Sequence, residues 1–283
     1  MEIGEIWGFR TAGIYASNAE ALNGPAYNFF KNGEMFRAYA GDLRFVDVDG
    51  DGIMTKGNRT LSNHGDMEII GNQSPRYQYS INMSLNWNGI GLSMLWQGVG
   101  KRDWYPWTES GFFWGKWNRA YNSLMKTQTG DRVVKIDKST DNWRVTNMDK
   151  NPYWTRMVSL AANRNDGPLT WENDHYLQDA SYIRLKNLTI DYNFPKELVN
   201  KIGLQALKIY VSGENLLTFS PLKKYAKNYD PEGIYAGDAD YGTNKFGSDN
   251  FGDGDGYPVM KSYTIGLSIT CLLYTSPSPR DRT

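Results

Sequence analysis

The most constraining feature of the sequence is a long run of alternating residues that crosses a tight turn. From Tyr77 to Trp87 every odd position is apolar or aromatic, and every even position is small or polar and uncharged. Only a strand whose two faces meet different surroundings needs this period of two. Asn88-Gly89 follows, the pair that most readily adopts the positive φ angles of a type I′ turn. After the turn the apolar positions are Ile90, Leu92, Met94 and Trp96. A two-residue loop therefore places every apolar side chain of the hairpin on one face.

Two architectures fit such a hairpin. A soluble β-sandwich would pack the apolar face on a second sheet, whereas a transmembrane barrel would turn that face to lipid and keep the polar face for a wet interior. A strand from residue 77 to residue 87 is roughly 35 Å long at about 3.4 Å per residue, and a tilt near 45° projects it onto an apolar band of ~25 Å. Strands of soluble proteins cluster nearer five or six residues. The length favours the membrane.

Connection lengths along the chain also favour a barrel. The expected strands are residues 3–10, 77–87, 90–98, 182–194, 206–219 and 261–270. Long segments join them at one end and short turns at the other, which is the arrangement of bacterial outer-membrane barrels. In the fourth strand the apolar positions change phase at Lys186-Asn187, which predicts a β-bulge. Residues 17–24 and 111–126 are expected to form short helices within the long segments.

The composition is compatible with this interpretation. Lys plus Arg and Asp plus Glu both number 31, so no net charge draws the chain to nucleic acid or to anionic lipid. The mean hydropathy is −0.60, and no apolar run approaches the length of a spanning helix, but alternation averages hydropathy away in a barrel strand. The single cysteine, Cys271, excludes an intrachain disulfide.

Several segments, in order, resemble one protein family. They are GDLRFVDVDGDG (41–52), IGNQSPRYQYSINMSLNWNGIGLSMLWQGVGKRD (70–103), DASYIRLKNLTIDYNFP (179–195), LKIYVSGENLLTFS (207–220), YDPEG (229–233) and YPVMKSYTIGLSIT (257–270). Together they are similar to the C-terminal barrel region of the SusC/RagA family of TonB-linked outer-membrane transporters of Bacteroidota. The expected fold class is therefore all-β: about six strands of an antiparallel, ~22-stranded transmembrane β-barrel, with long extracellular loops.

The resemblance also implies a function and partners. These are import of glycans, or of peptides in some members, energy from the TonB complex, contact with outer-membrane lipid, and a SusD-like surface lipoprotein that covers the barrel. The plug, the TonB-contact segment and a signal peptide are not found, and six strands cannot close a barrel. Residues 1–270 are therefore expected to be the C-terminal part of a longer receptor. Residues 271–283, LLYTSPSPRDRT after Cys271, are expected to be a non-native tail. The alternative is a secreted β-sandwich that binds carbohydrate.

An acidic segment resembles the start of an EF-hand loop. Asp47, Asp49 and Asp51 stand at positions 1, 3 and 5, with Gly52 at position 6 for the turn. Ile53 at position 7 would bind through its carbonyl, and Thr55 stands at position 9. Position 12 is Asn58 in place of a bidentate Glu, so Asp66 or Glu68 would have to complete the site. Ca²⁺ binding and a plain Asp/Gly turn both remain open.

A second set of candidates is aromatic. Trp104, Trp107, Trp114 and Trp117, next to Arg102 and Asp103, are candidates for stacking on sugar rings and binding substrate. An interfacial aromatic girdle plus the core of a large loop is the other interpretation. No spacing typical of a catalytic triad or a phosphate loop is present, and His64 and His175 are the only histidines. The sequence therefore predicts a transporter and no enzyme.

Overall fold

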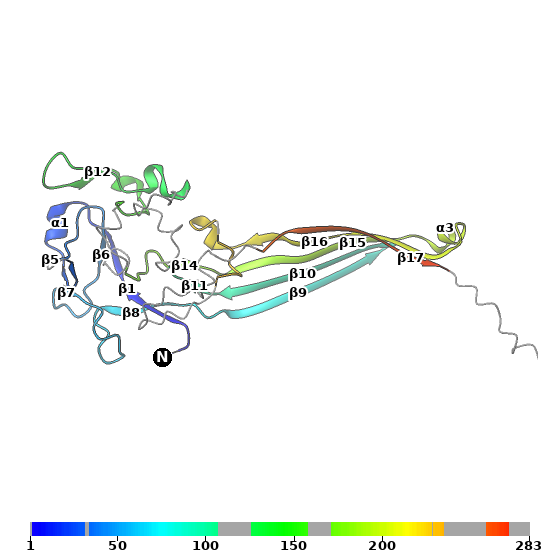
Figure 1. Cartoon of the computed structure of the whole chain (residues 1–283), viewed down its shortest axis with the longest axis horizontal. Helices are drawn as coiled ribbons and strands as arrows, with labels where there is room; N and C mark the ends of the chain where they lie inside the picture. The colour runs from blue at the N-terminus through cyan, green and yellow to red at the C-terminus, as the bar shows by residue number, and fades with distance from the viewer. Residues whose placement is uncertain are drawn as a thin grey trace, which may run out of the picture. The chain divides into compact units, whose positions relative to one another are not determined.

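The computed structural model describes residues 2–31, 34–106, 126–157, 171–227, 229–234 and 259–271 (Figure 1). The chain divides into two compact units, which are treated separately. The first comprises residues 1–75, 101–180 and 221–257, and the second comprises residues 76–100, 181–220 and 258–283. We call them the loop unit and the sheet unit. In the described part of the chain, no helix is long and apolar enough to span a membrane.

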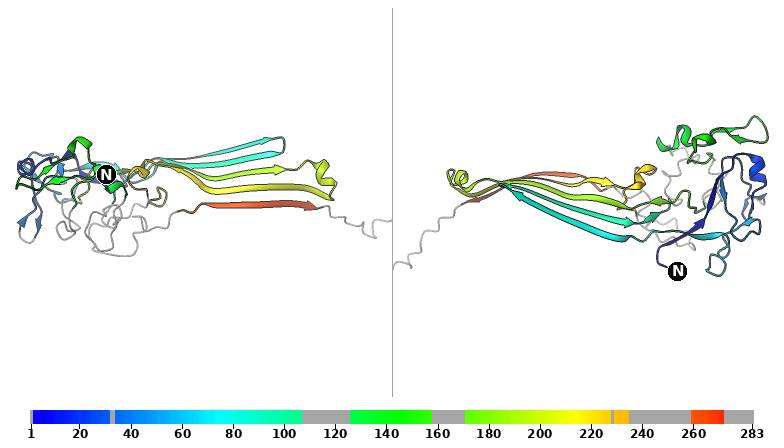
Figure 2. Two further views of the ribbon diagram at one scale, coloured as in Figure 1. Left: turned by 90° about the horizontal axis from the view of Figure 1, so that it is seen from above. Right: turned by 180° about the vertical axis from the view of Figure 1, so that it is seen from behind.

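The sheet unit is built on one five-stranded sheet. Its strands are β9 (Arg76–Trp87), β10 (Ile90–Lys101), β15 (Tyr182–Asn193), β16 (Leu204–Phe219) and β17 (Ser262–Cys271). They lie in the order β17-β16-β15-β10-β9, and Figure 2 shows them side by side in a single layer. The pairs β10–β15, β15–β16 and β16–β17 are antiparallel. All five strands had been predicted from alternation, with ends that differ by at most three residues.

The tight turn between β9 and β10 is confirmed. Asn88 has φ +46° and Gly89 has φ +84°, as a type I′ turn requires. A Cβ placed on Gly98 would lie 2.5 Å from the Tyr79 hydroxyl, and one on Gly100 would lie 3.2 Å from the Cβ of Tyr77. These neighbours are the ones expected when a two-residue loop sets the register. The sequence therefore fixes the pairing of this hairpin locally.

The predicted bulge in β15 is also confirmed. The register of β15 with β10 shifts between Leu185 and Asn187, so Lys186 has no partner on β10. The register with β16 shifts at the same place. One extra residue shifts the alternation by one position, so apolar residues at odd positions before the bulge and at even positions after it share a face. Leu185 thus faces the same way as Leu188, although the two are an odd number of residues apart.

One predicted strand is misplaced. Residues 3–10 were expected to be a sixth barrel strand, but β1 (Glu5–Phe9) pairs with β8 (Met67–Asn72) in a two-stranded sheet of the loop unit. β1 is five residues long, and it has buried residues on both faces. A strand with one face toward lipid would need nine to eleven residues and an exposed apolar row. Within the described residues, the barrel-like sheet therefore has five strands.

The loop unit is made of short elements around an aromatic core. Its further strands are β2 (Thr11–Ile14), β3 (Ala26–Tyr27), β4 (Phe30–Lys31), β5 (Glu34–Met35), β6 (Leu43–Phe45), β7 (Ile53–Met54), β11 (Asp103–Trp104), β12 (Ile136–Asp137), β13 (Arg144–Val145) and β14 (Gln178–Asp179). Short helical turns are α1 (Asn18–Leu22), η1 (Lys126–Gln128), η2 (Gly130–Arg132), η3 (Met148–Lys150) and η5 (Pro221–Lys224); α3 (Lys196–Asn200) belongs to the sheet unit.

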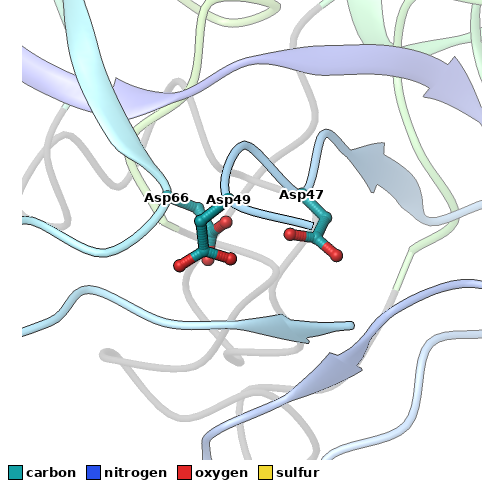
Figure 3. Close-up of side chains that lie close together, drawn as sticks. All are labelled: Asp47, Asp49 and Asp66. Carbon is teal, nitrogen blue, oxygen red and sulfur yellow. The ribbon is translucent and has the colours of Figure 1, made fainter. Parts of the chain in front are cut away.

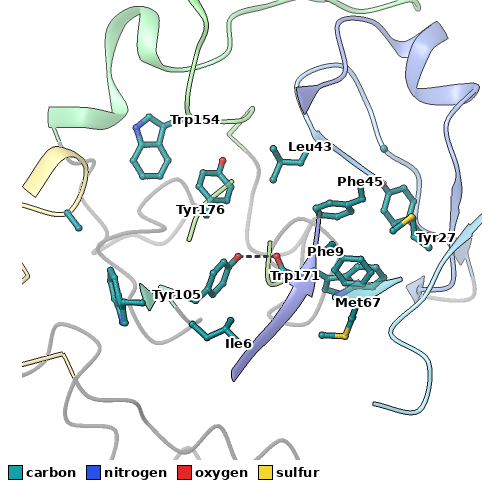
Figure 4. Close-up of a cluster of buried hydrophobic side chains, with 14 of the residues drawn as sticks. Ile6, Phe9, Tyr27, Leu43, Phe45, Met67, Tyr105, Trp154, Trp171 and Tyr176 are labelled. Atoms are coloured by element: carbon teal, nitrogen blue, oxygen red, sulfur yellow. Dashed lines mark hydrogen bonds between the residues drawn. The ribbon is translucent and has the colours of Figure 1, made fainter. Parts of the chain in front are cut away.

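The core of the loop unit is centred on Trp171. The Phe9 ring stacks on it with ring centroids 4.8 Å apart, and Phe45 and Tyr27 pack around the same indole (Figure 4). The hydroxyl of Tyr105 donates to the Trp171 carbonyl at 3.0 Å, so its buried polar atom is satisfied. These aromatic residues come from segments far apart in the sequence. The long segments thus form a packed unit of their own.

The helical turn predicted at residues 17–24 is present as α1. Ser17 is its N-cap, and its side chain accepts a hydrogen bond from the backbone N–H of Glu20. The carboxylate of Glu20 in turn accepts from the Ala16 N–H at 2.8 Å. The other expected helix, at 111–126, falls almost entirely outside the described residues. Residues 272–283 of the expected tail also lie outside them.

Candidate functional site

One face of the sheet is a continuous apolar surface. Strand registers align its side chains in rows, namely Ile90–Tyr192–Ile209–Leu267, Leu92–Ile190–Val211–Ile265 and Met94–Leu188–Gly213–Tyr263. Their exposure is unusual for a soluble fold, because Ile265 is 84% exposed and Val211 is 52% exposed. Exposed apolar patches of this extent mark a membrane or partner surface. This face, which we call the apolar wall, is the dominant surface feature of the sheet unit.

Aromatic residues lie near both ends of the apolar wall. Trp87 ends β9 at the turn end, where Tyr192 and Phe194 contact each other with ring centroids 4.9 Å apart. Tyr77 and Phe219 lie at the opposite end, and both are exposed. The backbone from residue 77 to residue 87 is roughly 35 Å long at about 3.4 Å per residue, which a 45° tilt projects onto ~25 Å. That is the height of the apolar band between the aromatic girdles of an outer-membrane barrel.

The opposite face of the sheet is polar. One row runs Gly91–Asp191–Tyr210–Gly266, and the next runs Ser93–Thr189–Ser212–Thr264. The Lys208 ammonium lies 3.1 Å from an Asp191 carboxylate oxygen. Such a face suits the aqueous interior of a barrel.

Glycines let the large side chains of this polar face lie flat. A Cβ on Gly266 would be 2.1 Å from Cζ of Tyr210, and one on Gly91 would be 2.5 Å from a carboxylate oxygen of Asp191. The phenol ring and the carboxylate therefore occupy the space above the two glycines. Sequence reasoning missed this arrangement, because the register that brings Gly266 to Tyr210 is a long-range property.

Residues 47–55, which we call the acidic loop, and Asp66 bring together three carboxylates. Oxygens of Asp47, Asp49 and Asp66 all lie within 4.8 Å of one another. Figure 3 shows the three side chains. Asp66, one of the two residues that the sequence offered to complete the site, thus lies in this cluster. Glu68 instead pairs with Arg10.

The backbone of the loop uses most of these carboxylates. Asp47 accepts hydrogen bonds from the N–H groups of Gly50 and Gly52, both at 2.7 Å. Gly50 and Gly52 have φ +75° and +83°, a conformation that favours glycine. Asp51 lies outside the three-carboxylate cluster and accepts from the Ile53 N–H. The arrangement is that of a tight Asp/Gly turn, and it also leaves three acidic groups close enough for one cation.

Asp66 anchors the acidic loop from its far side. Its side chain is fully buried and accepts from the backbone N–H groups of Val48 at 2.9 Å and Thr55 at 2.8 Å. Burial raises the pKa of the Asp66 carboxyl, and the nearby charges of Asp49 and Asp47 raise it further. The N–H of Asp66 also donates to the Thr55 carbonyl. The backbone N–H and carbonyl of Thr55 thus both form hydrogen bonds with Asp66. Cation binding by this loop remains a prediction.

The expected substrate residues do not assemble into an open site in the described part of the chain. Trp104 is 3% exposed and packs against Tyr229 with ring centroids 4.9 Å apart, so it belongs to the core and offers no face to a sugar. Arg102 donates to the carbonyls of Gln73, Pro231 and Ile234. The remaining candidates, Trp107, Trp114 and Trp117, lie outside the described residues.

Asp103 likewise holds the backbone together. Its carboxylate accepts a hydrogen bond from the Asn72 N–H at 2.9 Å. Arg102 and Asp103 therefore tie neighbouring segments of the loop unit to one another. Their proposed contact with substrate would need these bonds to be shared or broken.

A buried ion pair in the loop unit was not anticipated. Asp42, which is 1% exposed, forms a two-pronged ion pair with Arg156, with N–O distances of 2.5 and 2.9 Å. The Asp42 carboxylate also accepts from the Tyr39 N–H. A buried phenol lies nearby, and burial raises the pKa of Tyr176 to about 12. The pair spans more than a hundred residues, so local sequence gives no signal for it.

The comparisons with known proteins agree with this geometry. No family model matches the chain. The chain is 28% identical to TonB-dependent receptor P3 of Formosa agariphila over 270 residues, which cover 94% of this chain and 22% of that receptor. It is 26% identical to TonB-dependent receptor P26 of the same organism over 233 residues, covering 81% and 20%.

A solved structure of the RagAB peptide transporter is similar in fold. The TM-score is 0.50 at 16% identity, and the match covers 94% of this chain and 22% of that one. The chain thus spans about one fifth of the length of the relatives that it matches.

Proposed function

We infer a function from the premise that this chain is part of a TonB-dependent receptor of the SusC/RagA type, a β-barrel of the outer membrane. The five-stranded sheet is proposed to be a section of the barrel wall, with the apolar wall toward lipid and the polar face toward the interior. The loop unit then consists of the long connections on the outer side of the membrane. The role of the chain is transport and not catalysis.

The cargo and partners are further parts of the proposal. The receptor would import nutrient oligomers, either glycans or peptides, with energy from the TonB complex and together with a SusD-like surface lipoprotein. The resemblance of residues 1–270 to the SusC/RagA family supports this assignment. Peptides are included as candidate cargo because the similar solved structure is that of a peptide transporter.

One observation carries the wall assignment. Apolar side chains are aligned across four strands on one face, and they remain exposed over a height that matches the apolar band of a barrel. The soluble sandwich is the competing fold, and it would bury this face against a second sheet. Ile265 at 84% and Leu267 at 59% exposure are not covered in this way. The membrane assignment therefore accounts better for the surface.

Neighbouring residues of β17 provide a matched test of the wall assignment. Single cysteines at Thr264 and Ile265 would be made in the intact receptor in outer membranes, with Cys271 replaced by Ser. The cysteine at Thr264 faces the interior and should react with a charged, water-soluble thiol reagent. The cysteine at Ile265 should react only with a membrane-permeant, lipid-soluble one. Equal reaction of both sites with the charged reagent would contradict the assignment.

The cargo is tested in cells. A strain that lacks the receptor gene should lose uptake of one class of oligomer, either labelled glycans or labelled peptides, and a plasmid-borne copy should restore it. Uptake that continues unchanged for both classes would refute the import proposal, although the wall assignment would stand on the cysteine data.

A further inference from the structure

The connection between β15 and β16 has two exposed apolar side chains. It begins at Pro195, contains α3 (Lys196–Asn200) and ends at Gly203, whose φ of +78° reverses the chain. Leu198 is 55% exposed and Ile202 is 64% exposed. Leu198 lies within α3, and Ile202 lies in the turn that directly follows it.

The apolar side chains of this connection are held in place. Val199, between them in sequence, is 1% exposed and fixes α3 against its surroundings in the sheet unit. The N–H groups of Leu198 and Val199 both donate to the Pro195 carbonyl, and the Ile202 N–H donates to the Val199 carbonyl. Leu198 and Ile202 are thus presented by an ordered turn with its own buried contact.

This turn continues the apolar wall. β15 leads into it through Tyr192 and Phe194, and the Phe194 N–H donates to the Leu207 carbonyl, which extends the pairing beyond the end of β15. Figure 1 shows α3 at the end of the sheet where β9 ends at Trp87. The exposed Leu198 and Ile202 therefore lie just beyond the aromatic residues that mark one edge of the apolar band.

The charges of the turn suit a headgroup layer. Lys196 and Lys201 are exposed, and in the part of the chain that the structure describes neither forms an ion pair. Glu197 is the one acidic residue between Pro195 and Gly203. Lysine side chains extend their charged ends to a membrane interface while apolar side chains enter the boundary between acyl chains and headgroups.

We propose that residues 195–203 are an interfacial anchor. Leu198 and Ile202 enter the acyl–headgroup boundary of the membrane leaflet on the side of the short turns, and Lys196 and Lys201 contact lipid phosphates. The proposal rests on the wall assignment above, because only a membrane-embedded sheet brings this turn to a leaflet. The anchor fixes the height of the sheet in the bilayer at its turn end, where the wall itself ends.

The test uses a polarity-sensitive fluorophore at single cysteines in the intact receptor, in nanodiscs of phosphatidylethanolamine and phosphatidylglycerol. Cys271 and any other reactive cysteine are replaced. The sites are Leu198, Glu197 as the matched polar neighbour, and Ile265 on the apolar wall. A nitroxide near the lipid headgroup should quench the label at residue 198 at least about twofold more than the label at residue 197. Discs without phosphatidylglycerol, or the K196Q/K201Q variant, should reduce that difference.

The outcomes separate the two proposals. If the label at residue 265 is quenched by lipid nitroxides but labels at 197 and 198 are quenched equally, the anchor is wrong and the wall assignment stands. A label at residue 198 that is shielded from both water and lipid would mean a protein contact and would also overturn the anchor. No lipid quenching at residue 265 would refute the wall assignment, and the anchor with it.

Discussion

A single charge placed on the apolar wall should have a cost that depends on its depth. Met83 lies near the middle of β9, between the aromatic residues Tyr77 and Trp87, and its side chain is 50% exposed. At about 3.4 Å per residue and a 45° tilt, residue 83 is roughly 10 Å from the level of Trp87, close to the bilayer midplane. Arginine at that depth on a lipid-facing strand position costs about 2–4 kcal/mol. Met83→Arg should therefore lower the folding equilibrium constant by about 30- to 700-fold.

The assay is equilibrium folding of the intact receptor into lipid vesicles in a guanidinium titration. The folded fraction is measured from the heat-dependent gel mobility of the folded barrel. Met83→Ala separates the loss of the methionine from the added charge. Asn82→Arg places the same charge on the polar face one residue away and should cost little. Trp87→Arg, near the interface, should cost about 0–1 kcal/mol. The reasoning is refuted if Met83→Arg costs no more than Asn82→Arg, or if the cost shows no dependence on depth.

Three further predictions concern single sites. Asp42→Asn removes the buried charge partner of the partly buried Arg156 and should destabilise the protein by about 3–5 kcal/mol in chemical denaturation. Gly266→Leu places a side chain where the Tyr210 ring lies and should cost about 1–3 kcal/mol in the same measurement. Calorimetry should detect heat of Ca²⁺ binding that Asp49→Ala abolishes, and binding should weaken as pH falls through the raised pKa of the buried carboxyl in the cluster.

Each of these predictions has a matched control. Lys135→Ala removes an exposed ion pair with Asp131 and should cost far less stability than Asp42→Asn, and a cost equal to that of Asp42→Asn would contradict the burial argument. Tyr210→Ala in the Gly266→Leu background should recover stability, whereas additive losses would mean that the two side chains do not clash. Asp51→Ala should change the Ca²⁺ heat less than Asp49→Ala, and no heat at millimolar Ca²⁺ would end the cation hypothesis.

Much of the sheet could be predicted because its information is local. Alternation along Tyr77–Trp87 gives the strand, Asn88-Gly89 gives the turn, and the phase change at Lys186 gives the bulge. The candidate cation site was predictable in part, since Asp47 and Asp49 are close in sequence. The presence of Asp66 and not Glu68 in the cluster was not predictable. Asp66 accepts hydrogen bonds from the Val48 and Thr55 backbone N–H groups, whereas Glu68 forms an ion pair with Arg10.

The long two-faced strands with one apolar face follow from local sequence alone, because side-chain direction along a strand has a period of two regardless of distant contacts. The places of the short apolar segments depend instead on long-range packing. Residues 5–9 join the loop unit because Phe9 stacks on Trp171, a contact across more than 150 residues that no local pattern encodes. The same holds for Trp104, whose burial against Tyr229 makes it a core residue. Burial is a property of partners, and those partners come from distant parts of the chain.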